Sequence, residues 1–463
     1  MTSTQNLQAS VPQAVRQLAA VLERAGHKSW IVGGCVRDEL RAELDGRGAD
    51  SQRNDWDIAT SALPEQVTSL FRRVIPTGIQ HGTVTVLMGK EQYEVTTLRG
   101  EGAYSDGRRP DSVFFVSEIE RDLARRDFTV NAIAYDVLGD KLYDPFGGID
   151  DLKARRLRAV GDAAERFSED GLRVLRAARF VATLELTLDA DTARAIEPSL
   201  DSYRKVSAER IRDEWIKTMK ANQPSRAFEV MREHGMLAVS APELLESVGC
   251  QQNRHHAFDV WGHALACLDN CPKSPVLRLS GLLHDIGKPR TRAFSDKTSD
   301  YTFYEHERVG AEMVDPILQR LRFSNEERDK ITALVRHHLL CYDESWSDSA
   351  VRRWLRRVTP ELAPELYQLA EADVRGKGKD ATRDLAQIAA LQAHATRLLT
   401  EGAALSVRDL KVDGRTLMQA LGRKPGPWLG EVLRTLLDEV VEDPSLNDRE
   451  RLLARATELS GPG

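Results

Sequence analysis

The sequence predicts a multidomain α+β protein, in which one domain of mixed strands and helices is followed by helical domains. The chain has 463 residues, which exceeds what a single hydrophobic core usually serves. From about residue 29 to 100 the pattern favours strands and short helices, whereas beyond about 160 nearly every segment has the helical period. Pro and Gly in that second part fall at joints between segments. We therefore expect four domains, covering residues 1–158, 159–250, 251–378 and 379–463.

Some individual elements can be predicted directly. Residues 11–26 predict an amphipathic helix, because the four apolar residues Val15, Leu18, Ala19 and Leu22 share one face. Residues 83–88 and 92–98 predict a β-hairpin that turns at Gly89 and Lys90.

Composition excludes several classes of protein. The net charge of −6 gives no overall attraction to nucleic acid, so any RNA binding depends on local Lys/Arg patches. The five cysteines form no CxxC pair, which argues against a disulfide framework and a zinc ribbon. No apolar run approaches membrane-spanning length, and the N-terminus lacks a secretory apolar region. We expect a cytoplasmic protein with no membrane association, and the sequence indicates no obligate protein partner.

The most informative segment is the pair Asp55 and Asp57, together with Gly33, Gly34 and Arg37 upstream. Two aspartates one residue apart on a strand point to the same side. Carboxylates that close repel each other, and Mg²⁺ relieves the repulsion while also binding phosphate oxygens. The glycines let the backbone approach a triphosphate, and Arg37 is near enough in sequence to neutralise it. The pattern indicates nucleotidyl transfer, with both aspartates as catalytic magnesium ligands.

Two further motifs, residues 125–132 and 169–180, complete a recognisable set. Together the four motifs resemble the bacterial CCA-adding enzymes (tRNA nucleotidyltransferases) and their poly(A) polymerase relatives, in the class II branch of the polymerase-β-like nucleotidyltransferases. Their order and spacing match over about residues 29–240. The resemblance implies a head of mixed sheet and helices, then a helical neck and body that support the nucleotide and tRNA. Residues 404–455 resemble the helical tail of the same family, which also binds tRNA.

The resemblance also implies roles for single residues. Arg126 matches an arginine that contacts the phosphate or sugar of the nucleotide, and Asp127 matches its partner, which helps to favour ribose. Glu94, in the second strand of the predicted hairpin, is a candidate for a third carboxylate near the aspartate pair.

Asp170 and Arg173 form a pair that can choose a base without a nucleic-acid template. They are three residues apart and are predicted to lie on one helix face. Cytosine and adenine both present an amine donor beside a ring-nitrogen acceptor, whereas uracil and guanine present the inverse. A carboxylate and a guanidinium therefore read C and A and reject U and G. Arg176 and Arg179 continue the series and can reach phosphates beside the base.

A second group of residues predicts a different metal site. Seven of the eleven histidines fall between residues 255 and 338. Their order resembles that of an HD-superfamily metal site, in which imidazoles and a shared aspartate bind transition metals such as Mn, Ni, Co or Fe. Some related enzymes carry an HD domain that hydrolyses 2′,3′-cyclic phosphates and 2′-nucleotides, so we expect a phosphohydrolase. The expected ligands are His263, His284, Asp285, His306, the first residue of the doublet His337-His338, and Asp373.

The sequence thus predicts addition of C, C and A to the 3′ end of tRNA from CTP and ATP. Residues 101–111 resemble the flexible loop that the family associates with the switch from C to A. Three alternatives stay open: a poly(A) polymerase, a tRNA nucleotidyltransferase that adds only A, and an HD phosphohydrolase whose head only binds RNA.

Overall fold

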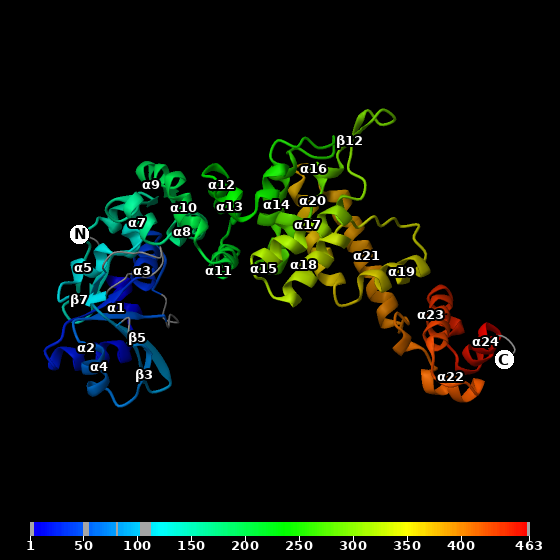
Figure 1. The fold of residues 1–463 in the computed structure, drawn as a ribbon, viewed down its shortest axis with the longest axis horizontal. Helices are drawn as coiled ribbons and strands as arrows, with labels where there is room; N and C mark the ends of the chain where they lie inside the picture. The colour runs from blue at the N-terminus through cyan, green and yellow to red at the C-terminus, as the bar shows by residue number, and fades with distance from the viewer. Residues whose placement is uncertain (1–3, 50–54, 80–81, 102–112, 461–463) are drawn as a thin grey trace. The chain divides into compact units, whose positions relative to one another are not determined.

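The computed structural model describes residues 4–49, 55–79, 82–101 and 113–460 (Figure 1). The loop expected at residues 101–111 lies outside these ranges from residue 102 onward. By its internal contacts the chain divides into two compact units, Met1–Pro242 and Glu243–Gly463. The division falls close to the predicted joint near 250, and the finer partition into four domains stays a prediction.

The first unit contains the predicted mixed sheet. Its seven strands run in the order β3-β4-β5-β2-β1-β8-β9, and all neighbours are antiparallel except β2 and β5. The strands are β1 Ser29–Val32, β2 Asp57–Thr60, β3 Val74–Gly78, β4 Thr83–Met88, β5 Glu91–Thr97, β8 Ala134–Asp136 and β9 Lys141–Tyr143. The predicted hairpin is confirmed, since β4 and β5 pair antiparallel from Thr83↔Thr96 to Met88↔Glu91.

The helix predicted at residues 11–26 is also confirmed, as α2 Gln13–Arg24, and its four predicted apolar residues are buried. A separate short helix, α1 Gln5–Ser10, precedes it. The chain breaks between the two because Pro12 takes an extended conformation and caps α2.

Helices follow the sheet in this unit. The central helix is α8 Leu172–Thr183, which packs against α11 Ala208–Thr218 and α12 Ser225–Glu233. The other helices of this unit are α3 Gly34–Leu44, α4 Pro64–Leu70, α5 Ile119–Ala124, α6 Gly148–Lys153, α7 Ala163–Glu169, α9 Ala190–Arg194, α10 Leu200–Arg204 and α13 Met236–Ser240.

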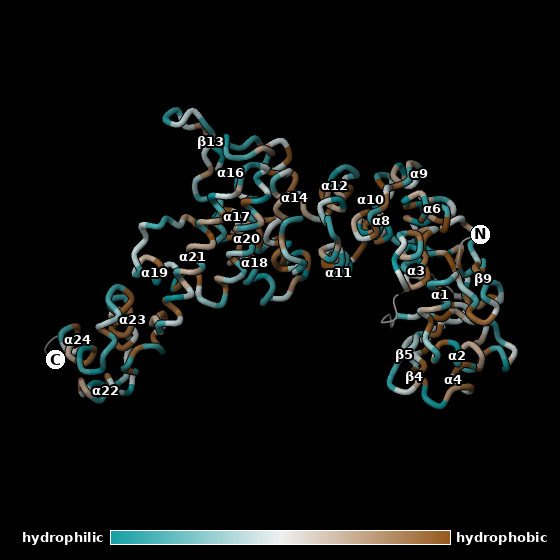
Figure 2. Tube along the Cα trace, turned by 180° about the vertical axis from the view of Figure 1, so that it is seen from behind, coloured by the Kyte–Doolittle hydropathy of each residue, from teal (hydrophilic) through white to brown (hydrophobic). Residues whose placement is uncertain are grey.

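The second unit is helical, as predicted, apart from the small hairpin β12 Ala293–Ser295 and β13 Asp300–Thr302. Figure 2 shows hydrophobic and hydrophilic residues alternating along its helices, as amphipathic helices require. Its helices are α14 Val260–Asn270, α15 Pro275–Leu283, α16 Lys288–Thr291, α17 His306–Arg320, α18 Asn325–His337, α19 Asp348–Val358, α20 Ala363–Gly376, α21 Thr382–Thr400, α22 Gly414–Leu421, α23 Pro427–Glu442 and α24 Arg449–Ser460.

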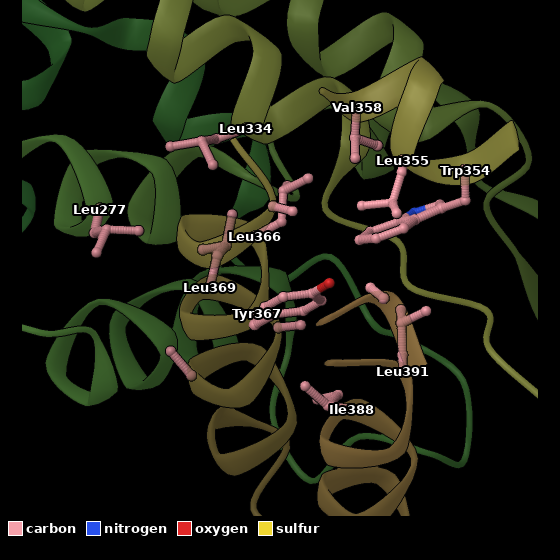
Figure 3. Close-up of a cluster of buried hydrophobic side chains, with 14 of the residues drawn as sticks. Leu277, Leu334, Trp354, Leu355, Val358, Leu366, Tyr367, Leu369, Ile388 and Leu391 are labelled. Atoms are coloured by element: carbon pink, nitrogen blue, oxygen red, sulfur yellow. The ribbon is translucent and has the colours of Figure 1, made fainter. Parts of the chain in front are cut away.

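Clusters of buried hydrophobic residues stabilise this unit. A large one joins α14, α15 and α18–α21 and includes Trp354, Leu366, Tyr367, Ile388 and Leu391 (Figure 3). A separate core lies among α22–α24 and contains Leu417, Leu436 and Leu452. Within the described ranges, none of the helices has the length and apolar composition needed to span a membrane.

Candidate functional site

The candidate nucleotide site is built on the turn between β1 and α3. Gly33 caps α3 with φ of +84°, a conformation that residues with a side chain rarely adopt. A Cβ atom at this position would lie 3.5 Å from Arg126 Nη1 and 3.6 Å from Asp57 Oδ2. The backbone at Gly33 therefore lies against both the predicted catalytic carboxylate and the predicted phosphate-binding arginine.

Three acidic residues concentrate negative charge at the start of the central strand, β2. Asp57 is the first residue of β2, and the register that pairs Ile58 with Val95 brings Asp57 beside Glu94 on β5. Burial and the charge of Glu94 raise the pKa of Asp57 to about 6, Arg126 opposes the shift, and Asp55 adds to it. This cluster has the donor chemistry that a divalent cation prefers.

The position of Asp55 differs from the prediction. We expected both aspartates on one strand, but β2 begins at Asp57, and the exposed Asp55 lies two residues before it. Exposure still alternates with period two across the pair, because both aspartates are exposed while Trp56 and Ile58 are buried. Asp55 is nevertheless close enough to affect the pKa of Asp57.

Arg126 and Asp127, although adjacent, face different partners. Arg126 donates to Asp122 Oδ2 at 3.2 Å. Asp127 Oδ2 accepts from Arg176 Nε at 2.8 Å and Nη2 at 2.6 Å, and Oδ1 accepts from the backbone of Phe128 and the side chain of Asn131. Burial alone would raise the pKa of Asp127, but Arg176 and Asn131 outweigh burial and hold that pKa well below its usual range. Asp127 thus fixes the position of Arg176.

The predicted base-reading pair lies at a helix junction. We expected Asp170 and Arg173 on one helix face, but α7 ends at Glu169, Asp170 has an extended backbone, and α8 begins at Leu172. The carboxylate of Asp170 accepts from Arg210 Nη1 at 3.1 Å and Nη2 at 2.7 Å. Arg173 donates from Nη1 to Glu169 and the Arg166 carbonyl, and from Nη2 to the Arg125 carbonyl.

One ring lies among the arginines of this site. The guanidinium carbons of Arg179, Arg176 and Arg37 lie 4.0, 5.2 and 5.5 Å from the centroid of Phe180. Cation–π attraction helps to hold this row of like charges together. Arg179 is also neutralised by Glu214, at 2.5 Å.

These side chains surround a cavity of about 500 Å³. All nine predicted nucleotide-binding residues and Asp57 line it: Gly33, Gly34, Arg37, Asp57, Arg126, Asp127, Asp170, Arg173, Arg176 and Arg179. The sequence reasoning missed the lining residues Arg125, Asn131, Leu172, Phe180 and Arg210. Arg125, Asn131, Leu172 and Phe180 lie inside the two motifs, so a reading of every motif residue could have found them.

A second site, in the helical unit, gathers three of the four predicted histidines around Asp285. His263 Nε2 lies 3.3 Å and His284 Nε2 3.1 Å from Asp285 Oδ2. His306 Nε2 lies 3.3 Å from the other oxygen, Oδ1. Asp373 Oδ1 adds a second carboxylate, 3.0 Å from His263 Nε2. Asp285 therefore faces two groups of imidazoles with its two oxygens, as a bridging ligand would.

Backbone carbonyls orient three of these rings. The Nδ1 atoms of His284, His306 and His338 lie 2.8, 2.7 and 2.7 Å from the carbonyl oxygens of Gly281, Phe303 and Val335. A carbonyl can only accept, so Nδ1 carries the proton and Nε2 presents a lone pair in the neutral ring.

These lone pairs converge. The Nε2 atoms of His263 and His284 are 3.1 Å apart, and those of His306 and His338 are 3.3 Å apart. Burial lowers the pKa of His284, but Asp285 and Asp373 outweigh burial and raise that pKa to about 9. Burial lowers the pKa of His338 to about 3, which keeps its ring neutral. The donor set fits a shared cation.

A close approach between the turn that follows α15 and the start of α17 positions this cluster. A Cβ atom at Gly287 would lie 2.2 Å from the carbonyl oxygen of His306, so only glycine permits this contact. The contact brings the His284-Asp285 doublet against His306. Lys288, on the same turn, places its Nζ 2.6 Å from Asp285 Oδ2.

The prediction of His337 as a ligand is wrong. His338, not His337, lies in the cluster and is buried, whereas His337 is only half-buried and lies near Arg336 and Arg357. A sequence signal for this existed, because Ile331, Leu334, Val335 and His338 follow the i, i+3, i+4, i+7 pattern of one buried face. His256 was also missed, and it lies close enough to His263 and Asp285 to share a metal ion.

Family models match three parts of the chain. Residues 29–158 match the poly A polymerase head domain, residues 185–247 match the family described as "Probable RNA and SrmB-binding site of polymerase A", and residues 306–456 match the tRNA nucleotidyltransferase domain 2 family. The mixed sheet, with Asp57 at the start of its central strand, and the match to this head domain thus define the first unit as a nucleotidyltransferase head of the poly(A) polymerase type.

Similarity over the whole chain identifies the family within this class of nucleotidyltransferases. The chain is 30% identical over 458 residues to the CCA-adding enzyme of Enterococcus faecalis, covering 98% of each. It is 47% identical to the CCA-adding enzyme of Lactobacillus helveticus over 209 residues, about half the length of that relative. The Bacillus stearothermophilus CCA-adding enzyme, solved in complex with CTP, matches with a TM-score of 0.70 and 27% identity, over 97% of this chain and 98% of that one. The chain belongs to the family of CCA-adding enzymes.

The contrast between the adjacent histidines gives a direct test of the helical-unit cluster. We expect His338→Ala to weaken binding of Mn²⁺ by about 100-fold, because it removes a buried neutral imidazole from the donor set. His337→Ala, the matched control, should keep wild-type affinity. Metal titration of both purified variants measures this, and equal losses in the two variants would contradict the assignment.

Proposed function

We propose that this protein adds C, C and A in turn to the 3′ end of tRNA, using CTP and ATP and releasing pyrophosphate. The observation that carries the proposal is the cavity lined by Asp57, a row of arginines and the Asp170–Arg173 pair, with Glu94 and Asp55 close enough to Asp57 to raise its pKa. Membership of the CCA-adding family supports it, as does the similarity to an enzyme solved with CTP. Such work on tRNA also favours a cytoplasmic location.

The carboxylates at the start of β2 fit a magnesium ion. Asp55 and Asp57 would hold it, with Glu94 as a third carboxylate. When bound there, Mg²⁺ would supply charge neutralisation for the attacking 3′ oxygen and for the departing pyrophosphate. Gly33 leaves room for the phosphates beside Arg126, and the 3′ hydroxyl then attacks the α-phosphate in line with the leaving pyrophosphate.

The base-reading pair retains hydrogen-bonding capacity for this role. An ionised carboxylate has about four acceptor positions and a guanidinium has five N–H donors. Asp170 accepts two hydrogen bonds from Arg210 and one from the backbone of Leu172. Arg173 uses Nη1 and Nη2 within the protein. Both side chains are therefore held in place while each keeps positions with which to read the edge of C or A.

Loss of the acid cluster should separate catalysis from binding. We expect Asp57→Ala to abolish nucleotide addition to a tRNA that ends before CCA, while tRNA affinity stays within about twofold, because affinity comes from distributed phosphate contacts. Asp150→Ala, a change of an exposed acid on α6, serves as the control. Labelled CTP and ATP report the product. Substantial turnover by Asp57→Ala would remove the central claim, and incorporation of ATP alone by wild type would favour an A-adding enzyme or a poly(A) polymerase.

Base choice should depend on Asp170. We expect Asp170→Ala to raise incorporation of UTP and GTP relative to CTP and ATP by about tenfold, since one good bidentate base contact contributes roughly 1–3 kcal/mol of discrimination. Asp201→Ala, on the exposed surface of α10, is the matched control. Competition assays with all four nucleotides measure the ratio. Wild-type discrimination in Asp170→Ala would show that another group reads the base.

A second activity is proposed on a separate observation, the convergence of histidine nitrogens on Asp285. We propose that the helical unit is a metal-dependent phosphohydrolase. His263, His284, Asp285, His306, His338 and Asp373 would hold a transition metal such as Mn, Ni, Co or Fe, and the metal would supply Lewis-acid activation of a phosphate ester. Lys288, at the same carboxylate, would neutralise the phosphate.

The two activities should be independent. We expect His338→Ala to lose hydrolysis of p-nitrophenyl phosphate at least about tenfold while CTP and ATP addition stay at wild-type rates, because the head relies on other carboxylates. His337→Ala should retain both activities. Paired assays with Mn²⁺, Ni²⁺ or Co²⁺ measure this. Wild-type protein that binds metal yet hydrolyses nothing would reduce the cluster to a structural role.

A further inference from the structure

Two cavities meet at the histidine–aspartate cluster of the helical unit. One, of about 490 Å³, is lined by residues that include Lys288, Tyr301 and Tyr304. The other, of about 270 Å³, is lined by residues that include Tyr342 and Gln387. They share four lining residues: His338, Leu339, Asp373 and Lys377. Two of these belong to the metal-ligating set, so the cluster is accessible from both cavities.

The first cavity has the character of a phosphate site with an aromatic rim. Lys288 Nζ bonds to Gln252 Oε1 at 2.7 Å and lies 5.5 Å from the centroid of Phe303, which holds the cation in place. Tyr304 is 80% exposed at the mouth, where a planar group could stack on it.

The second cavity is different and none of the roles described above uses it. Its inner wall consists of Ile388 and Leu391 on α21, whose side chains belong to the hydrophobic core of this unit (Figure 3). Tyr342 lies on the wall, and its hydroxyl bonds to His394 Nδ1 at 3.2 Å. Gln387 and the Lys377–Asp384 ion pair, at 3.2 Å, supply the polar groups. An apolar chamber with a few placed polar groups is the usual form of a small-molecule subsite.

We infer that the cluster acts on an open phosphodiester with two organic substituents, and that the α21 chamber binds the second, aromatic substituent of the nucleobase type. The inference rests on the proposed phosphohydrolase activity. A phosphate at the cluster lies between two cavities, and a monoester has a substituent for only one of them. In the reaction, water forms a bond to phosphorus and one P–O ester bond breaks. The departing oxygen takes a proton and leaves as an alcohol, so the products are a phosphomonoester and that alcohol.

The test introduces large side chains into the second cavity and leaves the metal-ligating residues unchanged. Gln387→Trp places a large side chain in the chamber from a half-buried position on α21. Gln392→Trp makes the same change on the same helix at an exposed position, about 140° around the axis from residue 387. Cys341→Trp fills the chamber from another, exposed segment, so that a folding defect in one variant does not decide the result. The probes are bis(p-nitrophenyl) phosphate, a diester, and p-nitrophenyl phosphate, a monoester, with full-length Mn²⁺-loaded protein.

We expect wild type to prefer the diester and both chamber variants to lower kcat/KM for it by about tenfold, with the monoester, the metal content and CCA addition unchanged. Gln392→Trp should match wild type. Binding is measured separately, by calorimetric titration of the diester into metal-free protein, where Gln387→Trp should raise Kd by a similar factor. Equal effects on the two esters, or unchanged diester kinetics and binding in the chamber variants, would overturn the inference. If wild type hydrolyses neither ester but binds the diester, and Gln387→Trp weakens that binding, the proposed activity fails and the subsite stands.

Discussion

The nucleotide cavity depends on the pairing of buried charges that are far apart in the sequence. Arg176 on α8 is neutralised by Asp127, and Arg179 by Glu214 on α11. Asp170, at the start of α8, is held by Arg210, one turn before Glu214 on the same helix. Charges this close to an interior are tolerated only when they are paired and hydrogen-bonded. The pairs therefore fix α8 between the segment that carries Asp127 and α11, and these charged side chains line the cavity.

The same constraint applies in the helical unit, where fewer of the buried ionisable groups are neutralised by other side chains. Its histidines present lone pairs toward one another because carbonyl oxygens hold their other nitrogens. Arg176 and Asp127 neutralise each other, whereas the carboxylates and imidazole lone pairs of this cluster favour an added positive charge. Lys288 supplies one at Asp285 Oδ2, and the raised pKa of His284 shows that the carboxylates favour another. A bound metal would take the position that these proton and ammonium charges now share.

The sequence predicted what lies within single elements and motifs. Helical spacing of apolar residues located α2, the strand pattern located the β4–β5 hairpin, and Asp57 and the nine predicted nucleotide-binding residues all line one cavity. Contacts between elements could not be predicted, because nothing local indicates that Arg210 on α11 meets Asp170. The error over which of the adjacent histidines is a ligand was avoidable, because the buried face of α18 selects His338 over His337. The start of β2 could not be predicted, because the order of Asp55 and Asp57 says nothing about where that strand begins.

The net charge of the whole chain contrasts with the charged residues that line the head cavity. A net charge of −6 gives no general attraction for nucleic acid, yet the head cavity is lined by seven arginines and three aspartates. Several of these arginines are engaged by carboxylates or carbonyls of the protein itself, so much of their charge does not act at long range. What they retain is fixed direction, since a guanidinium held by two bonds presents its other N–H groups along set lines. A chain that is acidic overall can therefore still present a cavity whose local charge and hydrogen-bond donors suit an anionic ligand.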